Sequence, residues 1–170
     1  MIADGRLQMK YQRFEELPVW NDAVELSAQI FAFAKDPELR RLGDAANQLE
    51  RAGLSISNNI AEGFERGTTQ ELLTFIYYAR GSAGEVRSIL HVLNRVAALA
   101  HLQSEICNLM TKAESISRQL RAWAGTLQNT DVTGTRYQND KNRDRQEARQ
   151  KADAFMTKLK TLTPHLQSEI

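Results

Sequence analysis

The fold of this chain is decided by the stretch Ser55-Ile56-Ser57-Asn58-Asn59-Ile60-Ala61-Glu62-Gly63-Phe64-Glu65-Arg66-Gly67. Apolar residues recur through it, and before it, at spacings of three and four, which marks one face of a helix. Small and polar side chains lie among them, although a solvated helix face more commonly carries Lys, Glu and Ala. The stretch therefore indicates either close helix packing or a polar network at an interface.

Glycines and a capping motif mark where this helix ends and the next begins. Gly63 and Gly67 bracket the C-terminal end, where left-handed backbone angles are common. The residues from Thr68 to Glu71 form a capping box, in which the Thr68 hydroxyl binds the backbone of residue 71 and Glu71 reaches back. One helix is thus predicted to end near Arg66 and another to begin at Thr69.

The same apolar periodicity predicts four helices joined by short connections. The expected helices run from about residue 18 to 35, from 38 (or 44) to 66, from 69 to 98 and from 102 to 127. Gly43 is expected to break the second. Such seams and connections predict an all-α, antiparallel, up-down-up-down four-helix bundle. Gly81 and Gly84 weaken the third helix, so we expect a neighbouring helix to approach it closely there. The inner stripe of the first helix is predicted to contain Trp20, Ala23, Val24, Ser27, Ile30, Phe31 and Ala34.

The domain organisation follows from where this pattern stops. Residues 1–128 are predicted to form the bundle, and residues 129–170 a polar linker followed by a short amphipathic fifth helix. The apolar side of that helix would carry Phe155, Met156 and Leu159. The sequence from His101 to Ile106 recurs as residues 165–170, and no physical role follows from this repeat.

Composition excludes several classes of protein. The single cysteine, Cys107, rules out an intrachain disulfide framework, and no apolar run is long enough to cross a membrane. We therefore expect a cytoplasmic protein without membrane contact. The net charge is +1 for the whole chain, −1 for residues 1–128 and +2 for residues 129–170. A charge so close to neutral argues against a strong sequence-wide attraction to nucleic acid.

Catalysis has little support in the sequence. The three histidines lack metal-ligand spacing, and the chain has neither a Gly-rich phosphate loop nor a nucleophile elbow. Glu62 and Glu85 are the candidates for paired carboxylates on adjacent helices. Alternatively they pair with Arg66 or Arg80. We predict a protein that is not an enzyme and that needs no cofactor or metal.

Four arginines are the candidate nucleic-acid-binding residues, because guanidinium groups contact RNA or DNA phosphates. Arg80 and Arg87 lie one heptad apart on one face of the third helix, and Tyr77 and Tyr78 are available to stack on bases. The alternative interpretation is that these arginines form salt bridges at the surface or at a subunit interface. The four are Arg51, Arg66, Arg80 and Arg87.

A second set of residues predicts an oligomer interface or a polar network. Small polar groups on a helix face can fix the register between subunits, as buried polar residues do in coiled coils. The set comprises Ser55, Asn58, Asn59, Glu62 and Glu85.

Four segments, in order from about Phe14 to Leu127, resemble a known family of four-helix bundles, first described from intervening sequences in 23S ribosomal RNA genes. The resemblance implies a homo-oligomer, a pentamer in similar proteins. It extends to the accessory proteins of diversity-generating retroelements, whose partners are nucleic acid and a reverse transcriptase. The segments are Phe14 to Trp20, Gln48 to Ala52, Asn59 to Gly63 with Arg66, and Phe75 with Ala79 to Ser82 and Glu85.

Two functions are compatible with these observations. The first is a non-enzymatic, homo-oligomeric bundle that binds RNA, DNA or a ribonucleoprotein partner, with a retroelement accessory protein as its specific form. The alternative is a protein-interaction scaffold that does not contact nucleic acid. Charge distribution distinguishes them, because concentrated arginine on one face favours the first and evenly paired charges favour the second.

Overall fold

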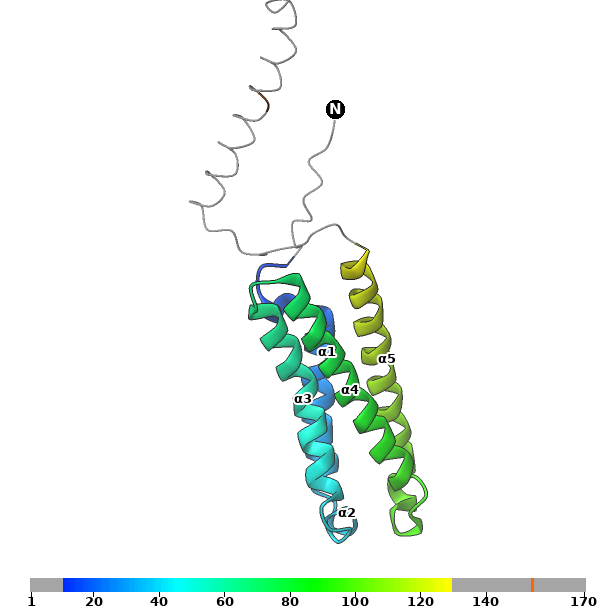
Figure 1. Cartoon of the computed structure of the whole chain (residues 1–170). Helices are drawn as coiled ribbons and strands as arrows, with labels where there is room; N and C mark the ends of the chain where they lie inside the picture. Colours follow the sequence, from blue (N-terminus) through cyan, green and yellow to red (C-terminus); the bar gives the residue numbers. More distant parts are fainter. Residues whose placement is uncertain (1–10, 130–153, 155–170) are drawn as a thin grey trace, which may run out of the picture. The chain divides into compact units, whose positions relative to one another are not determined.

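The computed structural model describes residues 11–129 and residue 154 (Figure 1). Within them the chain is helical and contains no strand, which confirms the predicted all-α bundle. The predicted linker and fifth helix lie outside the described residues, apart from residues 129 and 154. The elements are η1 (Phe14–Glu16), α1 (Pro18–Phe33), α2 (Pro37–Arg40), α3 (Ala45–Glu65), α4 (Thr69–Leu93), η2 (Ala97–Leu102) and α5 (Gln103–Gln128).

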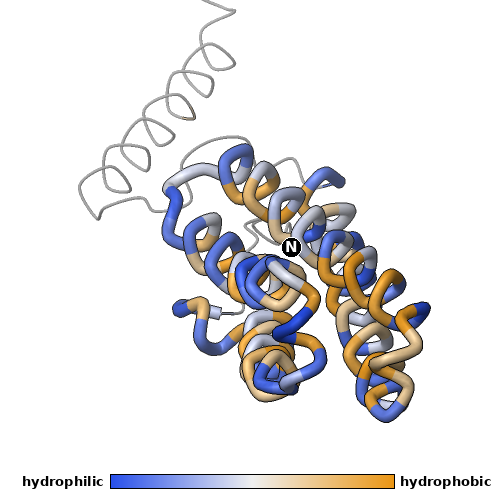
Figure 2. The backbone as a smooth tube through the Cα atoms, turned by 90° about the horizontal axis from the view of Figure 1, so that it is seen from below, coloured by the Kyte–Doolittle hydropathy of each residue, from blue (hydrophilic) through white to orange (hydrophobic). Residues whose placement is uncertain are grey.

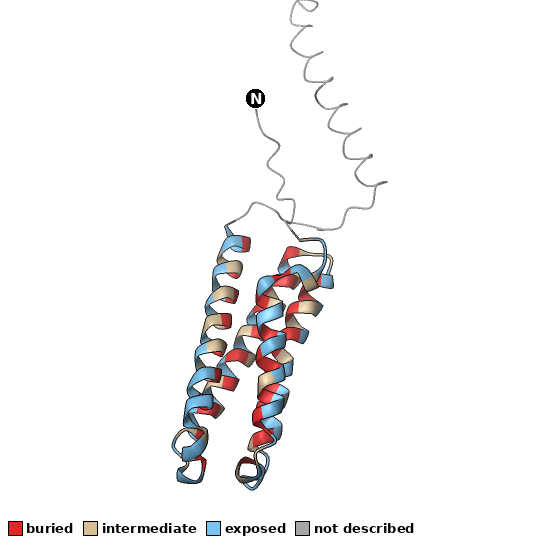
Figure 3. Cartoon of the chain, turned by 180° about the vertical axis from the view of Figure 1, so that it is seen from behind, coloured by how far each residue is buried: buried red, intermediate tan, exposed pale blue. Residues whose placement is uncertain are grey.

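The four long helices pack in a cyclic order. Helix α1 contacts α3, α3 contacts α4, α4 contacts α5, and α5 returns to α1. Successive long helices reverse direction through short connections (Figure 1). Hydrophobic and hydrophilic residues alternate around each helix (Figure 2), and the buried residues lie on the sides that face the other helices (Figure 3). The arrangement is the up-down-up-down bundle that the apolar pattern predicts.

The core of the bundle differs from the predicted inner stripe at two positions of α1. Val24 and Phe31 are 39% and 40% exposed, whereas Leu26 and Phe33 are buried in their place. An α-helix turns by roughly 100° per residue, so Val24 and Phe31 point away from the core positions that immediately precede them. Their prediction as inner residues is wrong, and they leave two large apolar side chains at the surface.

The connection between α3 and α4 has the predicted capping box. The Thr68 Oγ1 atom accepts a hydrogen bond from the Glu71 backbone N–H at 3.2 Å, and α4 begins at Thr69 as predicted. The return contact differs from the expected one, because the Thr68 hydroxyl donates to Glu71 Oε2 at 2.8 Å. Glu71 therefore binds the side chain of Thr68 rather than its backbone.

The glycines serve different purposes from those predicted. Among the described residues only Gly43 has a positive φ, +70°, so the left-handed angles expected at Gly63 and Gly67 are absent. Gly63 lies inside α3, and a Cβ atom there would be 2.6 Å from Phe75 Cβ on α4. At Gly81 and Gly84 a Cβ atom would meet no described atom within 4 Å beyond the neighbouring turns of its own helix. Close helix approach thus depends on Gly63, and the expectation for Gly81 and Gly84 is wrong.

The end of α4 falls five residues before the predicted position, at Leu93. Val96 adopts an extended conformation, with ψ of 113°, and η2 follows it. A hydrogen-bonded pair anchors this connection, since His101 Nε2 lies 3.0 Å from Asp36 Oδ2. The bond from His101 lowers the pKa of Asp36, and the bond to Asp36 raises the pKa of His101.

None of the helices in the described residues is apolar over a length sufficient to span a bilayer.

Candidate nucleic-acid interface

The arginines of residues 11–66 are neutralised locally. Each of the five has a carboxylate within 3.0 Å. This part of the chain holds six Lys and Arg against ten Asp and Glu, a net charge of −4. The pairs are Arg13 with Glu15, Arg40 with Glu50, Arg41 with Glu38, Arg51 with Asp44, and Arg66 with Glu62.

The arginines of residues 67–129 have a different environment. None of these five has an ion-pair partner among the residues that the structure describes. This part of the chain holds six Lys and Arg against four Asp and Glu, a net charge of +2. The charge is therefore divided between an acidic half, which contains α1 and α3, and a basic half, which contains α4 and α5. The five are Arg80, Arg87, Arg95, Arg118 and Arg121.

The contact between α4 and α5 places three of these arginines along one seam. Gln128 Nε2 donates to the Tyr77 hydroxyl at 2.8 Å, which fixes the register of the two helices. Arg80 follows Tyr77 by three residues, and Arg121 precedes Gln128 by one heptad, so both lie on the flanks that meet. This register places Arg121 at a height between Arg80 and Arg87, which are about 10 Å apart along the axis. We call Arg80, Arg87 and Arg121 the seam cluster.

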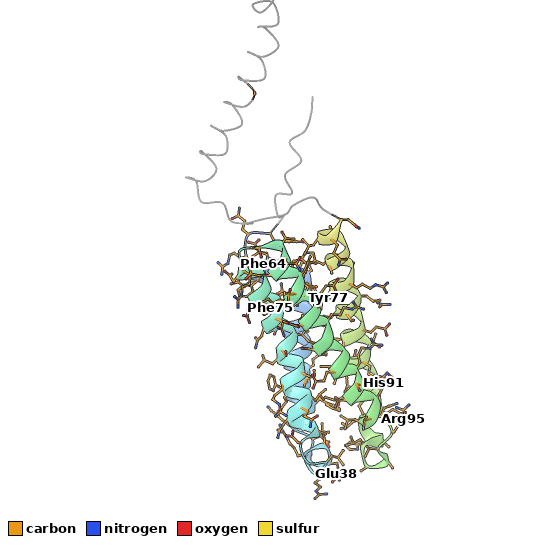
Figure 4. All side chains as sticks on the ribbon, viewed as in Figure 1. Glu38, Phe64, Phe75, Tyr77, His91 and Arg95 are labelled. Carbon is orange, nitrogen blue, oxygen red and sulfur yellow. The ribbon has the colours of Figure 1, made fainter. Side chains whose placement is uncertain are left out.

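The side chains of the seam cluster are suited to contact an anion. Arg80 and Arg87 are half-buried, which is the environment in which an arginine stem packs on apolar surface while its charged group stays in water. Tyr77, 42% exposed, lies at one end of the seam, and Figure 4 shows Tyr77 and His91 on α4 and Arg95 in the turn after it. The predicted heptad relation of Arg80 and Arg87 thus places two cations on the same flank.

Arg51 and Arg66 lie apart from this seam, on and just after α3. Arg51 Nη2 is 3.0 Å from Asp44 Oδ2. Arg66 bonds Glu62 at 2.5 Å, lies 3.9 Å from Glu71 and covers the Phe75 ring at 5.2 Å. The hydrogen bond to Glu62 raises the pKa of Arg66. Both arginines form the salt bridges of the alternative interpretation, and their role in nucleic-acid binding stays a prediction.

The predicted polar network is centred on Ser55. Its Oγ lies 2.9 Å from Ser82 Oγ on α4, and Asn59 Nδ2 donates to the Ser55 carbonyl at 2.7 Å and to its Oγ at 3.0 Å. Asn58, Glu62 and Glu85 are exposed and lie outside this network. The network therefore joins α3 to α4 within one chain, and an oligomer role for the set stays a prediction.

The two candidate carboxylates do not meet. Ser55 faces Ser82 and Gly63 faces Phe75, and this register places Glu85 level with residue 52 of α3. Glu62 is ten residues farther along, which corresponds to about 15 Å of helix. The pairing of Glu62 with Glu85 is therefore wrong, and Glu62 binds Arg66 instead, as its alternative states.

Other chemistry finds no support in the described part of the chain. No group of three or more His, Cys, Asp or Glu residues there is arranged to hold a metal ion. Cys107 is an exposed free thiol on α5, and Tyr78, 57% exposed, packs edge-on against Phe75. The seam cluster is accordingly the site that the geometry favours.

Sequence reasoning overlooked part of this site. Arg121 of the seam cluster is not among the residues predicted from the sequence, and neither are Arg95 and Arg118 elsewhere in the basic half, because the charges of the two halves cancel over residues 1–128. Net charges counted separately before and after the turn between α3 and α4 distinguish the acidic half from the basic half. The position of Arg121 beside Arg80 depends on the Tyr77–Gln128 contact, which no local sequence pattern predicts.

Comparison with known proteins gives two matches. Residues 15–122 match the family model described as 23S rRNA-intervening sequence protein. The fold is similar to the crystal structure of a protein of unknown function from the S23 ribosomal protein family of Bacteroides thetaiotaomicron VPI-5482, with a TM-score of 0.56 and 20% identity. That similarity covers 62% of this chain and 97% of the other. A search of curated proteins found no match.

Proposed function

Because this chain belongs to the family of 23S rRNA-intervening sequence proteins, we propose that it is a non-enzymatic, homo-oligomeric helical protein that binds RNA or DNA phosphates through its α4–α5 face. The related crystal structure is described as a protein of unknown function, so the proposal depends on the chain itself. The observation that carries it is the division of the described arginines, with five paired in residues 11–66 and five without a described ion-pair partner in residues 67–129.

The five arginines of residues 67–129 suit phosphate better than they suit a general role in solubility. A guanidinium group presents a rigid fork of donors that matches two phosphate oxygens. An arginine already bonded to a carboxylate has to break that bond first, whereas Arg80 and Arg87 are not held in this way by any described residue. The seam cluster therefore supplies several phosphate contacts at little cost of reorganisation.

Substitution of Arg80 and Arg87 together by alanine is expected to weaken binding to structured RNA and to DNA. Each lost phosphate contact lowers the slope of log K against log salt by about one, so the double variant should lose about two. Binding is measured on the full chain across a salt series. The matched comparison is Arg51→Ala with Arg66→Ala, which should lower the slope by less than the first double variant because both side chains are already ion-paired.

Two results would contradict this proposal. One is a double variant whose salt slope equals that of the unsubstituted protein. The other is the absence of binding at low salt by a well-folded sample, which would leave the protein-interaction scaffold as the function. The scaffold is favoured by one observation, the exposed large apolar side chains on α1 and α3.

Self-association is proposed to use those apolar side chains. Val24 and Phe31 lie one heptad apart on α1, and Leu54 follows Gly53, whose carbonyl accepts a hydrogen bond from Ser27 of α1. The three residues therefore lie beside the contact between α1 and α3. Large apolar side chains gathered in one region are typical of protein interfaces. A second copy of the chain is the partner that the family resemblance implies, as a pentamer.

Phe31→Glu combined with Leu54→Glu is expected to reduce the mass in solution to that of a single chain, because charges cannot be buried unpaired in a subunit interface. Light scattering on the full chain measures this. Val92→Glu on α4, where the native side chain is 62% exposed, is the control and should keep the oligomer. A single-chain mass for the unsubstituted protein would refute self-association.

The cellular role is proposed from the resemblance. A retroelement accessory protein would act in the cytoplasm and bind a reverse transcriptase as well as nucleic acid. The arginines of the basic half, which no described carboxylate pairs, support the nucleic-acid part of this role, and the apolar residues beside α1 and α3 offer a surface for a protein partner.

A further inference from the structure

Tyr77 presents an anchored aromatic ring beside the seam cluster. Its hydroxyl accepts a hydrogen bond from Gln128 Nε2 of α5 at 2.8 Å, and the residue is 42% exposed. The side chain is thus fixed at the seam while much of its surface stays in contact with water. Exposed aromatic rings are the surfaces on which the bases of single-stranded nucleic acid stack. Because the hydroxyl is already held, stacking on Tyr77 requires little further ordering of the side chain.

The three residues of the seam cluster follow one another in short steps. Arg80 and Arg87 are about 10 Å apart along α4, and Arg121 of α5 lies at a height between them, so successive residues are separated by about 5 Å along the seam. None of them has an ion-pair partner among the described residues. A carboxylate bounds the row, because Glu114 precedes Arg121 by one heptad on the same flank of α5. The row can therefore neutralise a few successive phosphates of one strand.

The surface beside these arginines is open. Gly84 follows Tyr77 by one heptad on α4, and Gly125 follows Arg121 by one turn on α5. At both glycines a Cβ atom would meet no described atom within 4 Å beyond the neighbouring turns of its own helix. No described side chain therefore covers the backbone at these two points. A strand can lie close to the seam there, and close approach of a ligand to the backbone is a common use of glycine.

A duplex suits this surface less well than a single strand does. The second backbone of B-DNA lies across a groove of roughly 6 or 12 Å, which places it away from the seam. Toward α3 it would meet the exposed side chain of Glu85 and, beyond it, the acidic half of the bundle. The bases of a duplex also stack on each other, so their faces cannot reach Tyr77. Charge and stacking therefore both favour a single strand.

We infer that the seam cluster binds a single strand of RNA or DNA, with one unpaired base stacked on the Tyr77 ring. The inference rests on the proposed function, because it names the form of nucleic acid that the same face binds. In a structured RNA the contacts fall on unpaired loops or ends. Stacking supplies affinity that does not depend on charge, whereas the guanidinium groups supply the dependence on salt. The two contributions can be measured separately.

Binding of the full chain to oligothymidylate, which does not pair with itself, is compared with binding to a blunt DNA duplex of equal length. The single strand is expected to bind about tenfold more tightly, because only its bases can stack on the ring. Charge alone predicts the reverse order, since a duplex of equal length carries twice as many phosphates. Equal or tighter binding of the duplex would overturn the inference and leave the proposed function standing. Absence of binding to both at low salt would overturn the two together.

Substitutions of adjacent residues test the stacked base. Tyr77→Leu removes the ring but keeps an apolar side chain, so oligothymidylate should bind about tenfold more weakly with an unchanged slope of log K against log salt. Tyr77→Phe keeps the ring and should retain most of the affinity. The matched control is Tyr78→Leu, because the Tyr78 ring packs edge-on against Phe75, on the side of α4 that faces α3. This control should bind oligothymidylate as the unsubstituted protein does.

An abasic strand of the same length, which keeps the phosphates and lacks the bases, separates stacking from an indirect effect of Tyr77. It should bind the unsubstituted protein and Tyr77→Leu equally. Unchanged oligothymidylate binding in Tyr77→Leu, or an equal loss in Tyr78→Leu, would refute stacking on Tyr77. A lower salt slope in Tyr77→Leu, or weaker binding of the abasic strand, would show that Tyr77 only positions the arginines, which would also overturn the inference.

Discussion

Replacement of Phe64 by alanine is expected to lower the free energy of unfolding by about 3–5 kcal/mol, the usual cost of deleting a large aromatic side chain from a packed core. Phe64 is 1% exposed and is among the largest fully buried side chains of the described residues. It lies in the last turn of α3, where that helix packs on α4. The loss combines removal of apolar surface from the core with the cavity that remains.

Urea unfolding followed by circular dichroism measures this loss at constant protein concentration. Val92→Ala is the control, because Val92 is also apolar but is 62% exposed and lies outside the proposed subunit interface. Its loss should stay below about 1 kcal/mol. Equal losses in the free energy of unfolding for the two variants would show that the burial of Phe64 does not stabilise the core as described.

Addition of one methyl group at Gly63 is expected to destabilise the bundle by about 1–3 kcal/mol. A Cβ atom there would lie 2.6 Å from Phe75 Cβ, and also 3.4 Å from the Leu72 backbone oxygen. Phe75 Cβ is bonded directly to its backbone, so it cannot yield without a shift of α4. The change is therefore unfavourable, although alanine is the better helix former.

Gly81→Ala adds the same methyl group and is expected to change stability in the opposite direction. Gly81 also lies within a helix, α4, but a Cβ atom there would meet nothing within 4 Å. Without a steric cost, the intrinsic preference for alanine should stabilise the protein by up to about 1 kcal/mol. Thermal and urea unfolding of both variants gives the comparison, and a stabilising Gly63→Ala would disprove the close approach of α3 and α4.

Much of the fold was accessible from the sequence because helix formation depends on local spacing. The apolar seam of α5, the capping box at Thr68 and the break at Gly43 are all signals within a few residues. The packing role of each glycine could not be predicted from the sequence, because it depends on which residue of another helix lies opposite. Gly63 and Gly81 look alike in the sequence and differ only in their neighbours.

The candidate site was predictable to a smaller extent. The heptad spacing of Arg80 and Arg87 identified a shared flank, but whether a nearby carboxylate neutralises an arginine depends on tertiary contacts. Arg66 and Glu62 lie four residues apart on one helix, so their pairing could be anticipated. Arg51 reaches Asp44 over seven residues, and Arg121 approaches α4 from a different helix. Neither arrangement follows from local periodicity.

The opposite net charges of residues 11–66 and 67–129 give this part of the chain an electric dipole across the bundle. A bundle that diffuses toward a polyanion would be turned with α4 and α5 foremost, and this steering weakens as salt shortens the range of the field. In a cyclic oligomer, rotational symmetry places the positive end of every dipole at the same distance from the axis. Contacts that are weak in one subunit would then act together on a single strand, so avidity would set the affinity.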